Sequence, residues 1–351
     1  MAEITIAGRR IGPGHPPYVI AEMSGNHNGD ISRAFALLEA AKAAGADAVK
    51  LQTYTADTIT IDHDGPGFRI EGGLWDGRTL YELYEKAHTP WEWHPRLFAK
   101  ARELGIALFS SPFDPTAVEL LEKLEAPAYK IASFEIVDLP LIRRVAQAGR
   151  PIVISTGMAN LDEIGEAIAA ARGAGCREIA VLHCTSGYPT PPEDSNLRTI
   201  ADLAASFDVV TGLSDHTRNI AVPVAAVALG ASLIEVHLTL RRADGGEDAE
   251  FSLEPEELTA MIGGCRTAWT ALGKVNYDLE ASEKGNKTFR RSLYAVKDIP
   301  AGAQLTADNV RSIRPGYGLP PKHLPEILGR RAGRAIARGT PLSWSLLEPG
   351  T

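Results

Sequence analysis

The sequence predicts a (β/α)8 TIM barrel followed by a smaller C-terminal domain. Apolar, β-branched runs recur along the chain, and each of them ends in polar residues. Amphipathic stretches separate these runs, with apolar residues at helical spacing and a glycine near several of their ends. Eight such strand–helix units within about 250 residues are typical of a (β/α)8 barrel. An open doubly wound sheet is the alternative, but it would need a Gly-rich phosphate turn after its first strand, and the sequence has none there.

The predicted strands and helices alternate in the order that the barrel requires. The predicted helices include residues 32–46, 114–126, 139–149 and 161–175, and a last helix runs from Glu254 to about Leu272. The eight predicted strands begin, in chain order, at Ile20, Ala48, Ile106, Ala128, Pro151, Ile179, Val209 and Leu233.

The longest interruption of this pattern follows the second strand, from Thr55 to about Arg96. It carries Trp75, Trp91 and Trp93. Because it follows the C-terminal end of a strand, we expect it at the active-site edge of the barrel. Long insertions there usually shape substrate binding, although some serve only as packing cover.

The pattern of polar and apolar residues changes after the last predicted helix. A polar stretch, 273–288, is predicted to be a linker between the barrel (residues 1–272) and a C-terminal domain (residues 289–351). That domain has short β runs, turns at 300–302 and 338–340, and no long helix. Because so short a segment can form only a small hydrophobic core, we expect it to pack against a neighbouring part of the protein.

Composition and charge exclude several classes of protein. The chain has 351 residues, of which 44% are hydrophobic and 23% charged, as in an ordinary globular protein. Its net charge of -8 gives no support for a nucleic-acid partner. The three cysteines show no CxxC spacing, which fits the reducing cytoplasm. The N-terminus lacks a signal-peptide core, and no apolar run approaches membrane-spanning length, so no membrane partner is expected.

Two histidines end the last two predicted strands, which are joined by a helix of small residues. Parallel neighbours end on the same edge of a sheet, so we expect His216 and His237 to meet there and to bind a divalent cation. Side chains alternate along a strand, so Asp215 points away from Ser214 and His216, which argues against a hydrolase triad. Two hydrogen-bonded core histidines are the alternative.

Polar residues also end the other predicted strands. Active sites of this fold form at these ends, so two lysines and several hydroxyls beside the histidine pair predict a site for an anionic, phosphorylated substrate and a metal. Ser-Ser-Pro and Ser-Thr-Gly are also typical of strand-to-helix turns and N-caps, whereas a buried lysine is costly unless its charge is compensated. The residues are Glu22, Asn26, His27, Asn28, Lys50, Gln52, Ser110, Ser111, Lys130, Ser133, Ser155, Thr156, Ser186 and Tyr188.

A lysine at a strand end is also compatible with a Schiff-base aldolase. The hydroxyl-rich surroundings and the second lysine favour phosphate binding instead. Borohydride reduction that trapped substrate on Lys50 or Lys130 would reverse this preference.

A series of short motifs follows in a fixed order along nearly the whole chain. They are IAEMSGNHNGD, VKLQTY, FSSPFD, YKIASFE, ISTGM, LHCTSGYPTP, GLSDH and EVHLTL, then RRSLYAVKDIPAG and SIRPGYG. In this order they resemble the sialic acid synthase family, whose C-terminal domain is an antifreeze-like (SAF, β-clip) domain. Within the family, LWDGRTLYELYEKAHTPWEWH and RRADGGEDAEFSLEPEEL are most similar to the pseudaminic acid synthase branch.

The resemblance implies a reaction and a set of site residues. Members of the family condense phosphoenolpyruvate with an open-chain amino sugar aldehyde and release phosphate by C–O cleavage. The pseudaminic branch implies 2,4-diacetamido-2,4,6-trideoxy-L-altrose as the sugar. His216 and His237 would bind Mn²⁺ or Mg²⁺, and Glu22 would be the acid/base. Phosphoenolpyruvate would be held by Lys50, Ser111, Lys130, Ser133, Ser155, Ser186 and Ser214, and the sugar would contact Gln52, Tyr188 and Asp248.

The resemblance also implies a homodimer with swapped C-terminal domains. Arg314, in SIRPGYG, would then reach the sugar's N-acetyl group in the partner's barrel. This sequence departs from the family pattern at two positions. Family members often have Asn at the position of Ser186 and Lys or Arg at the position of Val236. A shorter hydroxyl at 186 suggests a contact through water, while residue 236 points away from the site by alternation.

Two rival functions remain open at this point. A legionaminic or N-acetylneuraminic acid synthase would use the same chemistry on another sugar. From a different class, the C-terminal domain could indicate a binding or ice-interacting protein, but that function would leave the polar strand ends without a purpose.

Overall fold

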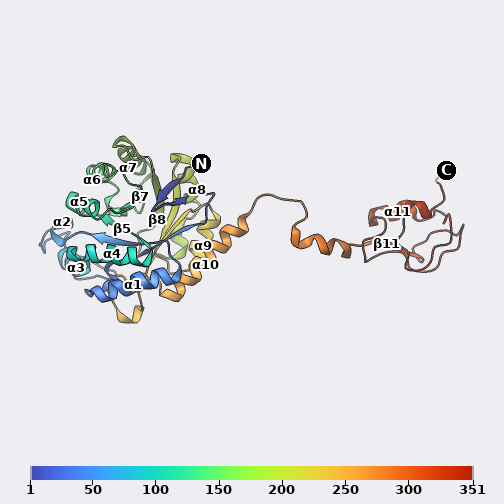
Figure 1. Cartoon of the computed structure of the whole chain (residues 1–351), viewed down its shortest axis with the longest axis horizontal. Coiled ribbons are helices and arrows are strands. Elements are labelled where there is room, and N and C mark those ends of the chain that lie inside the picture. Colours follow the sequence, from blue (N-terminus) through green and yellow to red (C-terminus); the bar gives the residue numbers. More distant parts are fainter. Residues whose placement is uncertain (1, 350–351) are drawn as a thin grey trace. The chain divides into compact units, whose positions relative to one another are not determined.

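Two compact units make up the chain, one up to Gly273 and one from Lys274 on (Figure 1). The structure is a computed structural model, and it describes residues 2–349. Each unit is described by itself below.

The first unit is a closed barrel of eight parallel strands, as predicted. The order around the barrel is β10-β3-β4-β5-β6-β7-β8-β9, so that the last strand closes on the first. The strands are β3 (Tyr18–Glu22), β4 (Ala48–Thr53), β5 (Ala107–Pro112), β6 (Tyr129–Ile131), β7 (Ile152–Ser155), β8 (Ile179–Cys184), β9 (Val210–Asp215) and β10 (Leu233–His237).

Helices surround the barrel (Figure 1), and their ends follow from local sequence signals. The side chains of Asp30, Asp114, Asp138 and Asn160 accept hydrogen bonds from backbone N–H groups in the first turns that they precede. Gly45 ends the first helix with a φ of 91°, which a residue with a Cβ rarely adopts. The helices are α1 (Ile31–Ala44), α2 (Ala56–Ile59), α3 (Leu80–Ala87), α4 (His94–Leu104), α5 (Pro115–Lys123), α6 (Leu139–Ala146), α7 (Leu161–Gly173), α8 (Thr199–Phe207), α9 (Ala221–Ala228) and α10 (Pro255–Leu272).

Several connections contain single turns of 3₁₀ helix. In the first unit these are Ser24–His27, Trp91–Trp93, Ser133–Glu135, Pro192–Ser195, Arg242–Asp244 and Ala249–Phe251.

An N-terminal hairpin, β1 (Ile4–Ile6) and β2 (Arg9–Ile11), was not predicted from the sequence. Its three-residue strands are too short to show a clear alternation. Ile4, Ile6 and Ile11 are buried in one apolar cluster with residues from inside the barrel, such as Tyr18 and Phe109. The hairpin therefore closes the end of the barrel at which the strands begin.

The inward-facing residues of the strands change character along the barrel axis. Near the strand starts they are apolar, for example Ile20, Ala128 and Val153. At the strand ends the same alternation brings in a buried polar layer, because every second side chain of a strand faces the interior. The members of this layer include Glu22, Lys50, Ser111, Lys130, Ser155, Ser214 and Glu235.

The second unit has a small core of its own around Leu293, Leu305, Ile327 and Leu342. Its strands are antiparallel: β11 (Ser292–Ala295) and β12 (Val310–Ile313). Its helical turns are Ala281–Phe289, Pro321–His323, α11 (Leu324–Ile327) and Trp344–Leu346.

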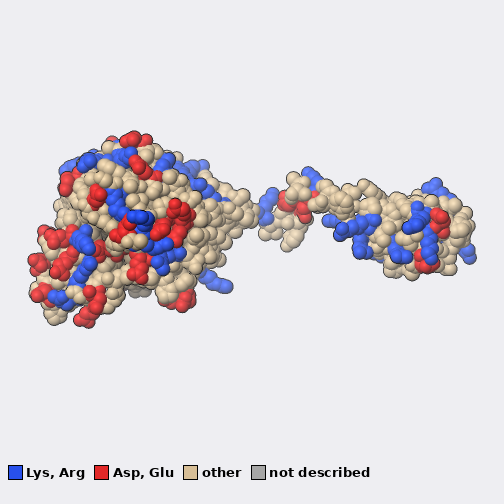
Figure 2. All heavy atoms as spheres, turned by 90° about the horizontal axis from the view of Figure 1, so that it is seen from below, with Lys and Arg blue, Asp and Glu red and all other residues tan. Residues whose placement is uncertain are grey.

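On the face of the first unit that Figure 2 shows, acidic and basic side chains are interspersed. Within residues 2–349, no helix is long and apolar enough to cross a membrane.

Candidate active site

Two lysines and two carboxylates meet inside the barrel at the strand ends. Lys50 Nζ lies 2.6 Å from Glu22 Oε2 and 3.7 Å from Glu235 Oε1, and Lys130 Nζ lies 3.5 Å from the same Glu235 oxygen. All four residues are at most 4% exposed. Glu235 thus bridges the two lysines. Its carboxylate compensates their buried positive charge, which would otherwise be costly.

Burial and charge set the protonation of this layer. Burial raises the pKa of Glu22 to about 7, although Lys50 opposes the shift. Burial also disfavours ionised Glu235, but Lys130 and Lys50 outweigh it and hold the pKa of Glu235 below its usual value. Despite the close ion pair, neither carboxylate oxygen of Glu22 has a partner in hydrogen-bond geometry among residues 2–349. At neutral pH Glu22 can therefore hold or release a proton.

Small hydroxyl side chains line the barrel wall beside the lysines. Lys50 Nζ donates to Ser111 Oγ at 3.3 Å, and the N–H of Gly157 donates to Ser133 Oγ at 3.1 Å. A Cβ at position 157 would collide with Ser133 Oγ and Ser186 Oγ, so a glycine is needed where these hydroxyls converge. Ser155 Oγ is buried and has no hydrogen-bond partner in the part of the chain that the structure describes, so it is available to a ligand.

His216 and His237 lie side by side at the ends of neighbouring strands, as the sequence predicted. Their ring centroids are 5.2 Å apart. Each ring is oriented through Nδ1, which lies 3.2 Å from Ser24 Oγ in His237 and 3.2 Å from the carbonyl oxygen of Thr185 in His216. Burial lowers the pKa of His237 well below its usual value, so this ring stays neutral. Burial opposes protonation of His216, but Cys184 outweighs it and raises the pKa of that ring. A neutral imidazole held through one nitrogen, as in His237, is the form in which histidine binds metals.

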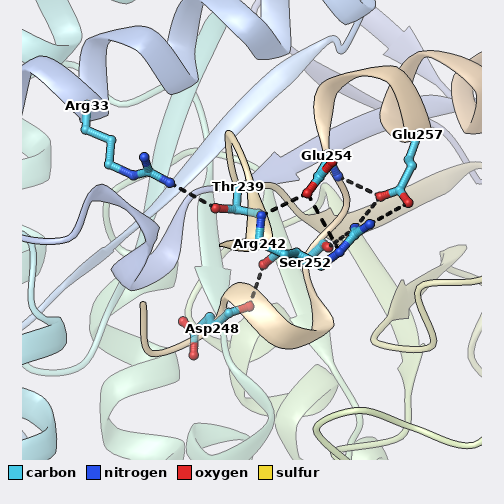
Figure 3. A network of polar contacts seen from close by, with 7 residues as sticks. All are labelled: Arg33, Thr239, Arg242, Asp248, Ser252, Glu254 and Glu257. Atoms are coloured by element: carbon cyan, nitrogen blue, oxygen red, sulfur yellow. Dashed lines mark hydrogen bonds and ion pairs between the residues drawn. The ribbon is translucent and has the colours of Figure 1, made fainter. Parts of the chain in front are cut away.

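Asp248 approaches the site from the β10–α10 loop (residues 238–254). The N–H of Gly25 donates to Asp248 Oδ2 at 3.4 Å, close to the Ser24 that orients His237. Figure 3 shows the contacts that hold this loop: Ser252 Oγ donates to the Asp248 carbonyl at 2.6 Å, and Arg242 lies between Ser252 and Glu257. The loop therefore presents Asp248 on a fixed backbone.

An aromatic wall stands beside the histidine pair. The ring of Tyr188 lies 4.7 Å from His216, 5.0 Å from Phe251 and 5.9 Å from Trp75, measured between centroids. Phe251 also lies 4.8 Å from His237. Of the three tryptophans expected at this edge, Trp75 reaches the wall.

Trp91 and Trp93 do not reach the aromatic wall. Trp91 Nε1 donates to the carbonyl of Tyr54 at 3.2 Å, and Trp93 packs edge-on against His27 with centroids 5.4 Å apart. They serve as packing for the insertion after β4.

Two asparagines at the end of β3 hold a loop instead of facing the site. Asn26 Nδ2 donates to the carbonyl of Leu238 at 2.9 Å and to Ser252 Oγ at 2.8 Å, and Asn28 Nδ2 donates to the carbonyl of Gly245 at 3.0 Å. Both anchor the β10–α10 loop.

The remaining predicted residues divide between the two units. Gln52 follows Lys50 on the inward face of β4. Ser214 lies on the inward face of β9, and His216 comes directly after the last residue of that strand. Arg314 is exposed and belongs to the second unit.

Sequence reasoning missed several residues of the site. Glu235 stands two positions before His237 and so faces the same side of its strand, a signal that was available. Ser24, Phe251 and Cys184, whose Sγ lies 3.9 Å from Ser186 Oγ, become neighbours of the site only through the turns and loops that carry them.

The fold and the site together define a class of enzyme. It is a barrel synthase whose buried lysine ammonium groups and hydroxyls suit an anionic substrate and lie beside two imidazoles. The model of the NeuB family matches residues 37–277, and the model of the SAF domain matches residues 290–348. The chain belongs to the NeuB family, the sialic acid synthase type, as the sequence motifs predicted.

Particular relatives narrow the comparison. The pseudaminic acid synthase of Campylobacter jejuni is 45% identical over 325 residues, 93% of this chain and 95% of the relative. The pseudaminic acid synthase of Helicobacter pylori is 44% identical over 334 residues, 95% of this chain and 98% of the relative. The crystal structure of N-acetylneuraminic acid synthetase from Leptospira borgpetersenii, solved with citrate, matches with a TM-score of 0.72 and 30% identity over 81% of this chain and 94% of its own.

Proposed function

We propose that this protein is a pseudaminic acid synthase, which condenses phosphoenolpyruvate with 2,4-diacetamido-2,4,6-trideoxy-L-altrose to give pseudaminic acid and phosphate. The observation that carries the proposal is the buried layer of Lys50, Lys130, Glu22 and Glu235 beside two imidazoles, in a chain 44–45% identical to pseudaminic acid synthases.

The residues of the layer fit the charges of the proposed reaction. Lys50 and Lys130 bind the phosphate and carboxylate of phosphoenolpyruvate, with Ser111, Ser133 and Ser155 as further hydrogen-bonding groups. C3 of phosphoenolpyruvate forms the new bond to the aldehyde carbon, and water adds to C2. The bond between C2 and the phosphate oxygen then breaks, and phosphate leaves with that oxygen.

Glu22 is the group that holds the proton taken from the attacking water. Its pKa of about 7 suits a residue that accepts and returns a proton at neutral pH. The lysines stabilise the charge of the departing phosphate. If ¹⁸O at the bridging position of phosphoenolpyruvate remained in the sugar acid, this scheme would be wrong.

His216 and His237 are suited to hold Mn²⁺ or Mg²⁺. Their Nδ1 atoms are oriented by protein groups, and His237 is neutral, which suits a metal ligand. Among residues 2–349 no group of three or more His, Cys, Asp and Glu side chains could hold a metal ion, so the protein would supply two ligands. A bound metal would supply polarisation of the aldehyde oxygen.

The sugar subsite lies against the aromatic wall in this proposal. Tyr188, Phe251 and Trp75 offer apolar faces to a 6-deoxy sugar with two N-acetyl groups, while Gln52 and Asp248 offer polar contacts. A legionaminic or N-acetylneuraminic acid precursor is the alternative substrate, to be decided by turnover.

We also propose a homodimer with swapped SAF domains, in which Arg314 serves the partner's site. Residues 290–351 hold ten Lys and Arg against four Asp and Glu, whereas the whole chain has a net charge of -8, so the C-terminal region is basic and the barrel acidic. Exposed apolar side chains after β6 and β7, namely Phe134, Val137, Met158 and Leu161, support a covered barrel edge.

We propose the cytoplasm as the compartment of this protein. The chain's three cysteines are free and buried, which fits a reducing environment.

The direct test is phosphate release from phosphoenolpyruvate in the presence of Mn²⁺ and a panel of 2-acetamido sugars. We expect the highest kcat/KM with 2,4-diacetamido-2,4,6-trideoxy-L-altrose. Higher turnover of a manno-configured sugar would reassign the substrate, and no release with any sugar would refute the proposal.

Metal dependence has its own test. We expect chelation to abolish turnover, Mn²⁺ to restore it, and His237→Ala to abolish both turnover and the rise in Tm that Mn²⁺ causes in the wild type. Full turnover in chelated enzyme would remove the metal from the proposal.

Mixing inactive variants tests the swapped dimer. His237→Ala in one chain and Arg314→Ala in the other leave one intact site in a swapped heterodimer, so coexpression should recover part of the activity. Recovery would be absent if Arg314 served its own chain's site.

A further inference from the structure

One residue of the β10–α10 loop collects three contacts from the insertion that joins β4 to α4 (residues 54–93). Glu247 Oε2 lies 2.6 Å from Arg78 Nη1, and Glu247 Oε1 lies 2.7 Å from Lys86 Nζ. The carbonyl oxygen of Glu247 accepts a hydrogen bond from Trp75 Nε1 at 3.0 Å. The Glu247 side chain is only 8% exposed, although its two cationic partners are much more exposed.

The part of the insertion that carries Trp75 has few other anchors. Residues 68–80 form a small hairpin-like turn, closed by hydrogen bonds between Ile70 and Arg78 and between Leu80 and Phe68. Residues 71–74 are exposed, and in the neighbouring helix α3 Leu83 is the buried residue. Glu247 therefore fastens a turn that the apolar core does not hold.

What this turn positions is the aromatic wall of the site. Trp75 lies 5.9 Å from Tyr188, which lies 4.7 Å from the ring of His216. On the loop side, the next residue is Asp248, which accepts from the N–H of Gly25. Glu247 thus links the turn to the segment that reaches the histidine pair.

We propose that Glu247 is a positioning residue that sets the specificity of the enzyme for its amino sugar. By clamping Arg78 and Lys86 it fixes the indole of Trp75 as one wall of the sugar subsite. This inference rests on the proposed function, because it assumes that the sugar binds beside the aromatic wall. The phosphoenolpyruvate layer of Lys50 and Lys130 is not among the contacts of Glu247.

The test compares Glu247→Gln with Glu250→Gln. Glu250 is an exposed carboxylate on the same loop, and no ion pair is found for it among residues 2–349. Glu247→Gln removes both ion pairs but keeps the backbone carbonyl that Trp75 uses. We expect the KM for the sugar to rise about tenfold, since small displacements of a positioning group cost one to two orders of magnitude, with the KM for phosphoenolpyruvate changed by less than about twofold.

A second measurement does not depend on turnover. Hydrogen exchange of residues 68–88 should be faster in Glu247→Gln than in the wild type and in Glu250→Gln, while the barrel strands keep their protection. Trp75→Phe should raise the KM for the sugar without faster exchange across the whole turn, because it leaves both ion pairs in place.

The outcomes separate this inference from the proposed function. Unchanged exchange and an unchanged sugar KM in Glu247→Gln would overturn the inference, as would equal rises in both KM values. If the wild type releases no phosphate with any amino sugar, the proposed function fails and the assignment of specificity falls with it. Faster exchange would in that case still show that Glu247 holds the turn.

Discussion

At the scale of single residues, the site depends on a balance of charge inside the barrel. Two lysines and two carboxylates occupy one buried layer, and Glu235 is shared between the lysines. Burial lowers the pKa of Lys130, for which Glu235 is the nearby ion-pair partner. The ammonium group of Lys130 thus depends on a residue that faces it from the opposite side of the barrel.

We expect Glu235→Gln to weaken the binding of phosphoenolpyruvate. Without the carboxylate, Lys130 is buried with no compensating charge and loses its proton, so the KM for phosphoenolpyruvate should rise by at least about tenfold. Steady-state phosphate release at varied phosphoenolpyruvate measures this, and Glu235→Asp should retain part of the affinity. An unchanged KM would mean that Glu235 does not sustain the charge of Lys130.

A second prediction concerns pH. The pKa of Glu22 is about 7, so as pH falls below 7 the carboxyl becomes protonated and cannot accept a proton from water. Turnover should therefore fall on the acid side with a midpoint near 7. The Glu22→Gln variant should lose about 10²–10⁴-fold in kcat, and its residual activity should lack this acid limb. An identical pH profile in the variant would assign the limb to another group.

At the scale of elements, strand ends supply side chains and loops complete the site. Residues that look equivalent in the sequence have different tasks: Glu22, the last residue of β3, faces the interior, whereas Asn26 and Asn28 in the connection after β3 hold the β10–α10 loop. Whether a polar residue faces the site or holds a loop depends on which backbone and side-chain groups the turn after its strand places within hydrogen-bond distance.

Close approach of two barrel strands gives a prediction for a glycine. A Cβ at Gly212 on β9 would collide with the carbonyl oxygen of Leu233 on β10 and lie 2.6 Å from Leu182 Cδ2. Since the backbone must move, Gly212→Ala should lower the free energy of unfolding by about 1–3 kcal/mol or more.

The matched control is Gly263→Ala on α10, where a Cβ would meet no atom of residues 2–349 within 4 Å. That change should be neutral or stabilise by up to about 1 kcal/mol. Urea unfolding compares the two variants, and equal stabilities would contradict the strand contact.

At the scale of the whole molecule, buried histidines outside the proposed site make the barrel sensitive to acid. His94 is fully buried, with Nε2 2.8 Å from Thr53 Oγ1 and Nδ1 3.2 Å from the carbonyl of Pro90. Burial lowers the pKa of His94 to about 4, and that of His27 to about 4 as well. Both rings are neutral in the folded protein at neutral pH.

We expect the contribution of His94 and His27 to stability to decline as pH falls from about 6.5 towards 4, whereas Glu22, Glu135 and Asp215, whose pKa values burial raises to about 7, 7 and 6, act in the opposite sense. The unfolded chain takes up protons on these histidines near their ordinary pKa of about 6.5, whereas the folded chain does not until about 4. Their contribution to stability is therefore complete above 6.5 and declines below it. Each histidine contributes up to about 1.4 kcal/mol per pH unit.

Urea unfolding at pH 7 and pH 5 measures this decline. His94→Gln should show a smaller loss between the two pH values than the wild type, whereas His63→Gln, at an exposed position, should match the wild type. The same loss in His94→Gln would exclude His94 as the acid-sensitive group.

The sequence by itself determined the barrel and most of the proposed site. Alternation along strands and parallel order place His216, His237, Lys50 and Lys130 at one edge, because these rules act on each strand and its neighbour alone.

Only the tertiary structure decided how these groups interact. The bridge of Glu235 across the barrel, the role of Trp75 in the aromatic wall and the contacts of Glu247 join residues from distant elements. Such contacts depend on how the barrel closes and how its long loops turn, and neither periodicity nor spacing encodes that geometry.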